Sequence, residues 1–236
     1  MSQASKQESL ELCIVMPAYN EEGCIARVVG SWLQLSRLID TEVKLVVVND
    51  GSKDRTGQIL EDLSKKHPQL VVVTQPNAGH GKALVNGYCK ALDLGARWVF
   101  QTDSDDQFRA QDFPQLWEKR DLSKFVTGRR KNRHDPLHRL VITRILRGLI
   151  NALYSVDLKD SNVPFRLIRA DYLRALLKAL PSDAPFAPNI FIAVLAKKDG
   201  QELFEIPISH AERKLGQSPL SNGVYSKFVF RVLGSL

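Results

Sequence analysis

Short apolar runs alternate with segments of helical periodicity along the first hundred residues. The apolar runs are too short for helices and predict buried strands at residues 12–16, 43–48, 70–74 and 97–102. Between them, apolar side chains such as Ile25, Val28 and Val29 recur at helical spacing and predict amphipathic helices, with a further helix over residues 81–94. Strands and helices that alternate with short connections predict an α/β fold, a mainly parallel sheet with helices on both faces.

The second half of the chain is less regular. We expect strands at residues 125–128, 165–169 and 202–208, and helices at residues 170–180, 188–197 and 224–233. An apolar stripe predicts a long helix over residues 138–154, with Arg139, Arg144 and Arg147 off the stripe. Packing in the core and lying on an anionic bilayer surface both explain such a helix.

Length and composition favour one globular domain. The chain has 236 residues, 44% of them hydrophobic, enough for one sizeable core. We place that domain at residues 12–218, between a flexible N-terminal tail at residues 1–11 and a C-terminal tail at residues 219–236. No apolar run approaches the roughly 20 residues that span a bilayer. Three cysteines without metal-ligand spacing favour a reducing, cytoplasmic location.

Positive charge is concentrated in one part of the chain. The net charge is +7, and cationic residues gather between residues 119 and 147, against only Asp121 and Asp135. Basic clusters attract phosphate groups. No helix-turn-helix, zinc-finger or aromatic RNA-binding pattern accompanies this cluster, which argues against nucleic acid as a partner. A phosphorylated small molecule or an anionic membrane surface explains the cluster.

An acidic loop follows the strand predicted at residues 97–102. Its sequence is Asp103-Ser104-Asp105-Asp106-Gln107. Alternate residues of an extended segment point the same way, so Asp103 and Asp105 share a side at the carboxyl end of a strand, where open α/β sheets bind ligands. Oxygen ligands in this place suit Mg²⁺ or Mn²⁺ bound together with substrate phosphates. The alternative for an isolated Asp-x-Asp is an acidic turn that caps the next helix.

Two other strand ends carry polar groups that we expect at the same edge. Tyr19 and Glu21 follow the first predicted strand, and Asp50 follows the second. An aromatic ring and a carboxylate would recognise a nucleoside, and a metal would hold its diphosphate. A dinucleotide site of the Rossmann type is excluded, because residues 17–22 lack the pattern Gly-x-Gly-x-x-Gly. A P-loop is excluded as well, because Ala83 stands where Ser or Thr must hold magnesium.

These motifs together resemble family 2 glycosyltransferases of the GT-A fold, and among them the dolichyl- and polyprenyl-phosphate mannose or glucose synthases. Residues 17–21 are similar to the opening Pro-x-Tyr-Asn-Glu, and residues 48–56 to Asp-Asp-Gly-Ser-x-Asp-x-Thr, with Asn49 at the first aspartate. Residues 103–107 are similar to the Asp-Ala-Asp-x-Gln of the polyprenyl-phosphate branch. The resemblance implies that the nucleotide sugar contacts Pro17, Tyr19, Glu21, Asp50, Asp103 and Ser104. It implies that the metal is held by Asp103, Asp105 and Gln107.

The resemblance continues downstream, to about residue 218. Residues 127–129 resemble a Gly-x-Arg or Gly-Arg element, and residues 160–166 resemble Asp-x-x-x-Gly-Phe-Arg, with Pro164 at the glycine. Residues 205–218 are similar to the Glu-Val-Pro-Ile ending with its arginine, although Pro219 replaces the lysine of that ending. The resemblance implies that Arg129, Arg166 and Arg213 meet the acceptor phosphate, and that Asp105, Arg129 and Arg213 are the catalytic residues.

The expected activity is therefore metal-dependent, inverting transfer of a hexose from a nucleoside-diphosphate sugar to a polyprenyl phosphate at the cytoplasmic face of a membrane. Residues 184–198 contain no acid, and Asn189 stands where hydroxyl-acceptor relatives commonly carry a carboxylate. A phosphate acceptor needs no such base, because its second pKa is about 6. The alternatives are a hydroxyl acceptor and a non-catalytic sugar-nucleotide-binding protein. The donor base, the hexose and the polyprenol stay open.

Overall fold

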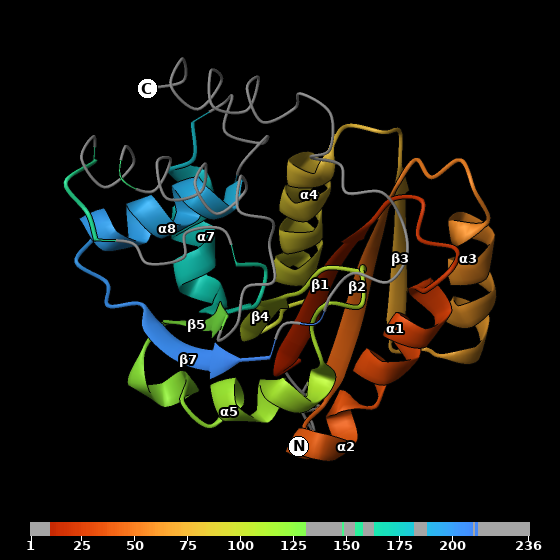
Figure 1. Cartoon of the computed structure of the whole chain (residues 1–236), viewed down its shortest axis with the longest axis horizontal. Helices are drawn as coiled ribbons and strands as arrows, with labels where there is room; N and C mark the ends of the chain where they lie inside the picture. Colours follow the sequence, from red (N-terminus) through yellow and green to blue (C-terminus); the bar gives the residue numbers. More distant parts are fainter. Residues whose placement is uncertain are drawn as a thin grey trace, which may run out of the picture.

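A computed structural model describes residues 10–130, 148, 154–157, 163–181, 188–209 and 211. The described strands form one seven-stranded sheet in the order β3-β2-β1-β4-β6-β5-β7 (Figure 1). Their bounds are β1 Leu12–Ala18, β2 Val43–Asp50, β3 Leu70–Gln75, β4 Trp98–Gln101, β5 Phe125–Arg130, β6 Arg166–Arg169 and β7 Phe204–Ile208. Only the pairs made by β6, with β4 and β5, are antiparallel among the described strands. The prediction of a mainly parallel sheet is confirmed.

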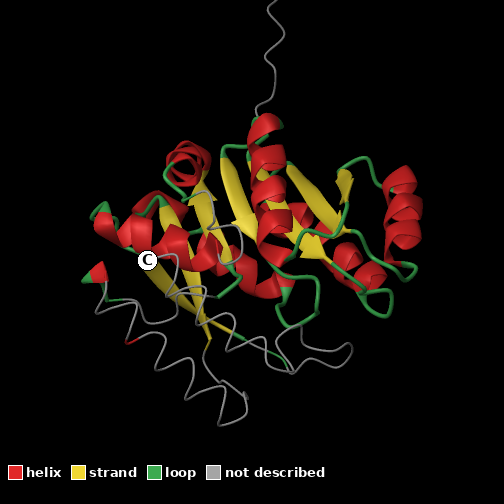
Figure 2. Cartoon of the chain, turned by 90° about the horizontal axis from the view of Figure 1, so that it is seen from above, coloured by secondary structure: helices red, strands yellow, loops and turns green. Residues whose placement is uncertain are grey.

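Helices cover both faces of the sheet (Figure 2). The described α-helices are α1 Ile25–Leu33, α2 Leu35–Ile39, α3 Thr56–Lys66, α4 His80–Asp93, α5 Phe113–Trp117, α7 Ala170–Lys178 and α8 Pro188–Lys198. Two single turns of 3₁₀-helix are η1 Ala110–Asp112 and η2 Arg120–Leu122. On β1, Leu12 and Ile14 pack into the core with α1 and α5, whereas Cys13 and Val15 pack with α4 and α7. A strand buried on both faces explains the continuous apolar run in the sequence.

An aromatic cluster fixes the strand that carries the acidic loop. Phe100 of β4 lies 5.3 Å from Trp32 of α1, 4.6 Å from Phe113 of α5 and 4.8 Å from Phe165, measured between ring centroids. Phe108 follows the loop and is buried, with its ring 5.6 Å from that of Phe165. Both ends of the acidic loop are therefore anchored in the core.

Helix α4 packs closely on the centre of the sheet. A Cβ atom at Gly87 would lie 2.4 Å from Cγ1 of Val15 on β1, so only glycine permits this approach. The packing holds the beginning of α4, at His80, near the ends of β1 and β2. This end of the helix borders the candidate site.

The predicted elements differ from the observed ones mainly at their ends, and α2 and α5 were not predicted. At the start of α3, Oδ1 of Asp54 accepts a hydrogen bond of 2.9 Å from the Thr56 N–H. Most of the helix predicted at residues 138–154, and all of that at residues 224–233, lie outside the described residues. In the part of the chain that is described, no helix has both the length and the apolar character needed to cross a membrane.

Candidate active site at the carboxyl ends of the strands

The loops after β1 and β2 are joined by hydrogen bonds. The Asn20 N–H donates to Oγ of Ser52 at 3.0 Å, and the Lys53 N–H donates to Oδ1 of Asn20 at 2.8 Å. The Glu21 N–H donates to Oγ1 of Thr56 at 2.8 Å. Tyr19 is 41% exposed beside these bonds. The two loops thus form one surface, with an aromatic ring available for stacking.

Asp50 is buried, with 2% of its surface exposed, and organises the loop that precedes α4. Its Oδ1 accepts hydrogen bonds from Nε2 of Gln75 at 2.7 Å and from the Ala78 N–H at 2.8 Å. Its Oδ2 accepts one from the Gly79 N–H at 2.9 Å. The role of Asp50 in shaping this loop was not anticipated from the sequence. Direct contact with a nucleotide stays a prediction for this residue.

His80 brings α4 into the site, a position that the sequence did not indicate. Its Nε2 lies 3.2 Å from Oδ1 of Asp103, and its ring is half exposed. Desolvation lowers the pKa of His80, but the hydrogen bond with Asp103 and the charges of Asp103, Asp105 and Asp50 outweigh it, so the pKa is raised. The local field therefore favours cations. A histidine at the predicted start of a helix was the only sequence signal for it.

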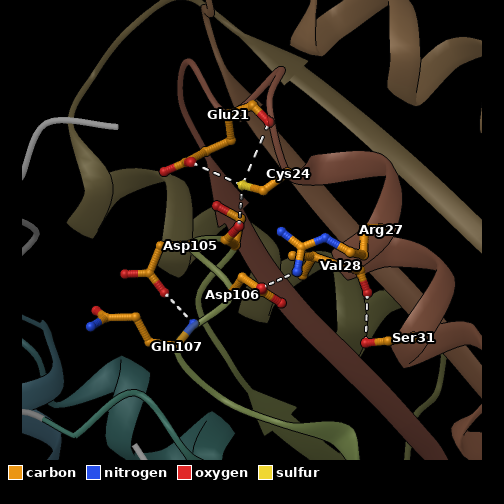
Figure 3. Close-up of polar contacts among 9 residues, drawn as sticks. Glu21, Cys24, Arg27, Val28, Ser31, Asp105, Asp106 and Gln107 are labelled. Atoms are coloured by element: carbon orange, nitrogen blue, oxygen red, sulfur yellow. Dashed lines mark hydrogen bonds and ion pairs between the residues drawn. The ribbon is translucent and has the colours of Figure 1, made fainter. Parts of the chain in front are cut away.

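The acidic loop presents its side chains in two directions (Figure 3). Asp105 and Gln107 point to the same side, and Oδ1 of Asp105 accepts a hydrogen bond of 3.2 Å from the Gln107 N–H. Asp106 points the other way, toward α1, where it forms an ion pair with Arg27. Its backbone is left-handed, with φ of 62°. The common side of Asp105 and Gln107 thus goes with the left-handed conformation of Asp106. The side that the sequence predicts Asp103 and Asp105 to share stays a prediction.

The donor set at this loop fits a hard divalent cation. Among the described residues, no group of three or more His, Cys, Asp or Glu side chains is placed to hold a metal. Mg²⁺ typically keeps several waters and binds through one or two carboxylates together with substrate phosphates. In such a site, Asp103 and Asp105 would supply those carboxylates, and the Gln107 amide would supply one more oxygen. These residues fit a cation that completes its coordination with water and a diphosphate.

Gln107 also ties the acidic loop to the segment after β7. Its side-chain Nε2 donates to the Ala211 carbonyl at 3.1 Å. The main-chain carbonyl of Gln107 accepts a hydrogen bond of 3.0 Å from the Ala211 N–H. Nearby, the Ser209 N–H donates to Oδ2 of Asp112 at 3.1 Å. These hydrogen bonds hold the segment after the edge strand β7 beside the loop that follows β4. Arg213 follows Ala211 by two positions and lies outside the described residues.

The predicted acceptor arginines have different environments. Nε of Arg129, on β5, lies 3.8 Å from Oε2 of Glu205 on β7, and its side chain is half exposed. Arg166 is only 1% exposed, and it donates to the carbonyls of Val163 at 2.8 Å and Asn189 at 2.6 Å. These contacts give Arg166 a structural role between β6 and α8 that the sequence did not indicate. Phosphate contact stays a prediction for both arginines.

Comparisons with known proteins find a matching family model and relatives over most of the chain. The family model described as Glycosyl transferase family 2 matches residues 13–177. The chain is 27% identical over 208 residues to an undecaprenyl-phosphate 4-deoxy-4-formamido-L-arabinose transferase of Edwardsiella ictaluri, which covers 87% of this chain and 61% of that protein. It is 26% identical over 232 residues to an undecaprenyl-phosphate mannosyltransferase of Micrococcus luteus, covering 94% and 93% of the two chains.

The chain thus spans about three fifths of the length of the Edwardsiella relative. Among solved structures, it is similar to glucosyl-3-phosphoglycerate synthase from Mycobacterium tuberculosis, crystallised with Mn²⁺, uridine diphosphate and glucosyl-3-phosphoglycerate. The TM-score is 0.68 at 20% identity, over 95% of this chain and 79% of the other. This likeness shows that the two proteins share their fold.

Proposed function

Because the chain belongs to glycosyl transferase family 2, we propose that it transfers a hexose from a nucleoside-diphosphate sugar to a polyprenyl phosphate with the help of Mg²⁺ or Mn²⁺. The observation that carries the proposal is the acidic loop at the end of β4, where Asp105 and Gln107 point to one side and the field favours cations. Two relatives named for undecaprenyl-phosphate substrates support the acceptor. A structural neighbour crystallised with Mn²⁺ and uridine diphosphate supports the donor class.

Some residues of the site are proposed to bind the nucleotide sugar, and others to hold the cation. Tyr19 offers an exposed ring on which a base can stack. Asp103, Asp105 and Gln107 would hold the cation, which when bound offsets the charge of the departing diphosphate. Asp50 keeps the loop before α4 in place through three donors, and so shapes the wall of the donor site.

The acceptor side of the site needs positive charge more than it needs a base. In the proposed reaction a phosphate oxygen attacks the anomeric carbon as the bond to the diphosphate breaks, which inverts the configuration. A phosphate monoester is already ionised near neutral pH and has no proton to lose. Helix α8 carries no acid, in agreement with such an acceptor. Arg129 and Arg213 are proposed to attract the phosphate, and the basic cluster to hold the protein at the cytoplasmic surface of a membrane.

The proposal is tested by removing one carboxylate of the acidic loop. Asp105→Ala should reduce Mn²⁺-dependent transfer to a short-chain polyprenyl phosphate by at least about 100-fold, as when a charge-stabilising group is lost from other active sites. Asp62→Ala, which removes an exposed carboxylate paired with Lys65 on α3, is the matched control and should leave transfer unchanged. Near-normal transfer by Asp105→Ala would refute the metal site.

A further inference from the structure

The residue just before α1, Cys24, reaches the acidic loop through its buried thiol. Sγ of Cys24 lies 3.4 Å from the Ser104 carbonyl and 3.2 Å from Oε2 of Glu21 (Figure 3). Burial, followed by the hydrogen bond to Glu21 and its charge, raises the pKa of Cys24 to about 12. The thiol therefore stays protonated at neutral pH, and its single S–H lies between two acceptors, the Glu21 carboxylate of the loop after β1 and the Ser104 carbonyl of the loop after β4.

Helix α1 makes a second contact with the acidic loop, one turn after Cys24. Arg27 stands three positions after Cys24, on the same side of α1, and its guanidinium pairs with the Asp106 carboxylate. The two contacts fix nearby positions of the loop, Ser104 and Asp106. They connect segments about 80 positions apart in the sequence.

Asp106, which pairs with Arg27, has a left-handed backbone conformation. A positive φ is uncommon for residues other than glycine, and Asp106 has φ of 62°. This conformation lies in a bend of the chain between Asp105 and Gln107. The ion pair draws the Asp106 carboxylate toward α1 and away from the side that Asp105 and Gln107 share. It thereby keeps a third carboxylate from repelling an incoming diphosphate.

We propose that Cys24 and Arg27 are positioning residues, which hold the acidic loop in the geometry that binds a metal and diphosphate. The inference rests on the proposed function, since it assigns these residues to the same metal site. It predicts that Arg27 acts on metal affinity through Asp106, and that loss of Arg27 weakens binding without unfolding the protein.

The test measures Mn²⁺ binding in the presence of uridine diphosphate, by the loss of the free Mn²⁺ signal in electron paramagnetic resonance. Arg27→Ala should weaken Mn²⁺ affinity about two- to fivefold, the range for loss of an exposed ion pair. Arg97→Ala removes another exposed arginine, which pairs with Glu11 at the opposite end of β4, and should leave Mn²⁺ affinity unchanged. Equal Mn²⁺ affinities in these two variants would overturn the inference.

A double-mutant cycle separates positioning from a general effect of charge. Asp106→Asn removes the ion pair, and asparagine tolerates the left-handed backbone. In the Asp106→Asn background, Arg27→Ala should cause no further loss of Mn²⁺ affinity, because the partner is already gone. Fully additive losses would show that Arg27 acts on the site by another route and would contradict the inference.

The thiol is tested by a pair of variants. Cys24→Ala removes the donor to Ser104 and should weaken Mn²⁺ binding, whereas Cys24→Ser keeps a donor and should restore most of the affinity. Unchanged binding in Cys24→Ala would remove Cys24 from the inference, and absence of Mn²⁺ binding by the unsubstituted chain would overturn the inference as a whole. If Mn²⁺ binds and responds to Arg27 but no hexose reaches polyprenyl phosphate, the proposed acceptor alone fails.

Discussion

Gly51→Ala is expected to damage the donor side of the site through a steric clash with backbone. Gly51 follows β2 with φ of +67°, in the turn just after Asp50. A Cβ atom there would lie 2.6 Å from the Asn77 nitrogen and 3.2 Å from the Gln75 carbonyl oxygen. Both neighbours are main-chain atoms, which cannot rotate away, so the substitution must displace the loop that Asp50 holds.

The loss of folding free energy expected for Gly51→Ala has two parts. A left-handed alanine costs about 1–2 kcal/mol, and overpacking of this kind typically costs about 1–3 kcal/mol more. Gly95→Ala is the matched control, since Gly95 has φ of +77° but no atom within 4 Å of an added Cβ. The control should lose only the first part, about 1–2 kcal/mol. At about 2–4 °C per kcal/mol for a chain of this size, Tm should fall by about 2–8 °C for Gly95→Ala and about 4–20 °C for Gly51→Ala.

Thermal unfolding and uridine diphosphate binding of the two variants together decide the matter. Gly51→Ala should unfold at the lower temperature and bind uridine diphosphate more weakly, because Ala78 and Gly79 are displaced from Asp50. Gly95→Ala should bind the nucleotide normally. Equal Tm values for the two variants would refute the steric argument.

Two further predictions follow from single contacts. Gln107→Glu keeps an oxygen ligand for the metal but removes the amide N–H that donates to the Ala211 carbonyl. We expect Mn²⁺ binding that is unchanged or tighter, and an acceptor KM raised about two- to tenfold, as for loss of one hydrogen bond. An unchanged acceptor KM would contradict this. For Asp54, burial raises the pKa, but hydrogen bonds from Thr56 and Glu22 outweigh it and lower the pKa. Its stabilisation is therefore present above the unfolded pKa of about 3.9 and lost as pH falls through the folded pKa, so Asp54→Asn should lower Tm at pH 7 but not near pH 2, and equal losses at both would count against it.

Local patterns were sufficient to predict most of the fold. The apolar run at residues 12–16 predicted β1, observed at Leu12–Ala18, because a strand buried on both faces needs apolar side chains at consecutive positions. The acidic loop was located because Asp103 and Asp105 follow such a run directly. The order of the strands and the antiparallel placement of β6 leave no comparable local pattern.

The contacts that shape the site connect residues far apart in the sequence. Asp50 meets its donors only because β3 lies beside β2 and leads into α4. His80 meets Asp103, and Cys24 meets Ser104, across 23 and 80 positions. The burial of Arg166 was equally hidden, since a cation in the sequence suggests exposure until packing places backbone carbonyls around it.

The measurement that tests the proposed activity most directly offers the chain two acceptors that differ in one group. A nucleoside-diphosphate hexose and Mn²⁺ are supplied with equal amounts of a short-chain polyprenyl phosphate and the same polyprenol with a free hydroxyl, and the lipids are identified by mass spectrometry. The proposed function predicts hexose on the polyprenyl phosphate alone, and none after the metal is removed with a chelator. Hexose on the free polyprenol, with none on the phosphate, would contradict it.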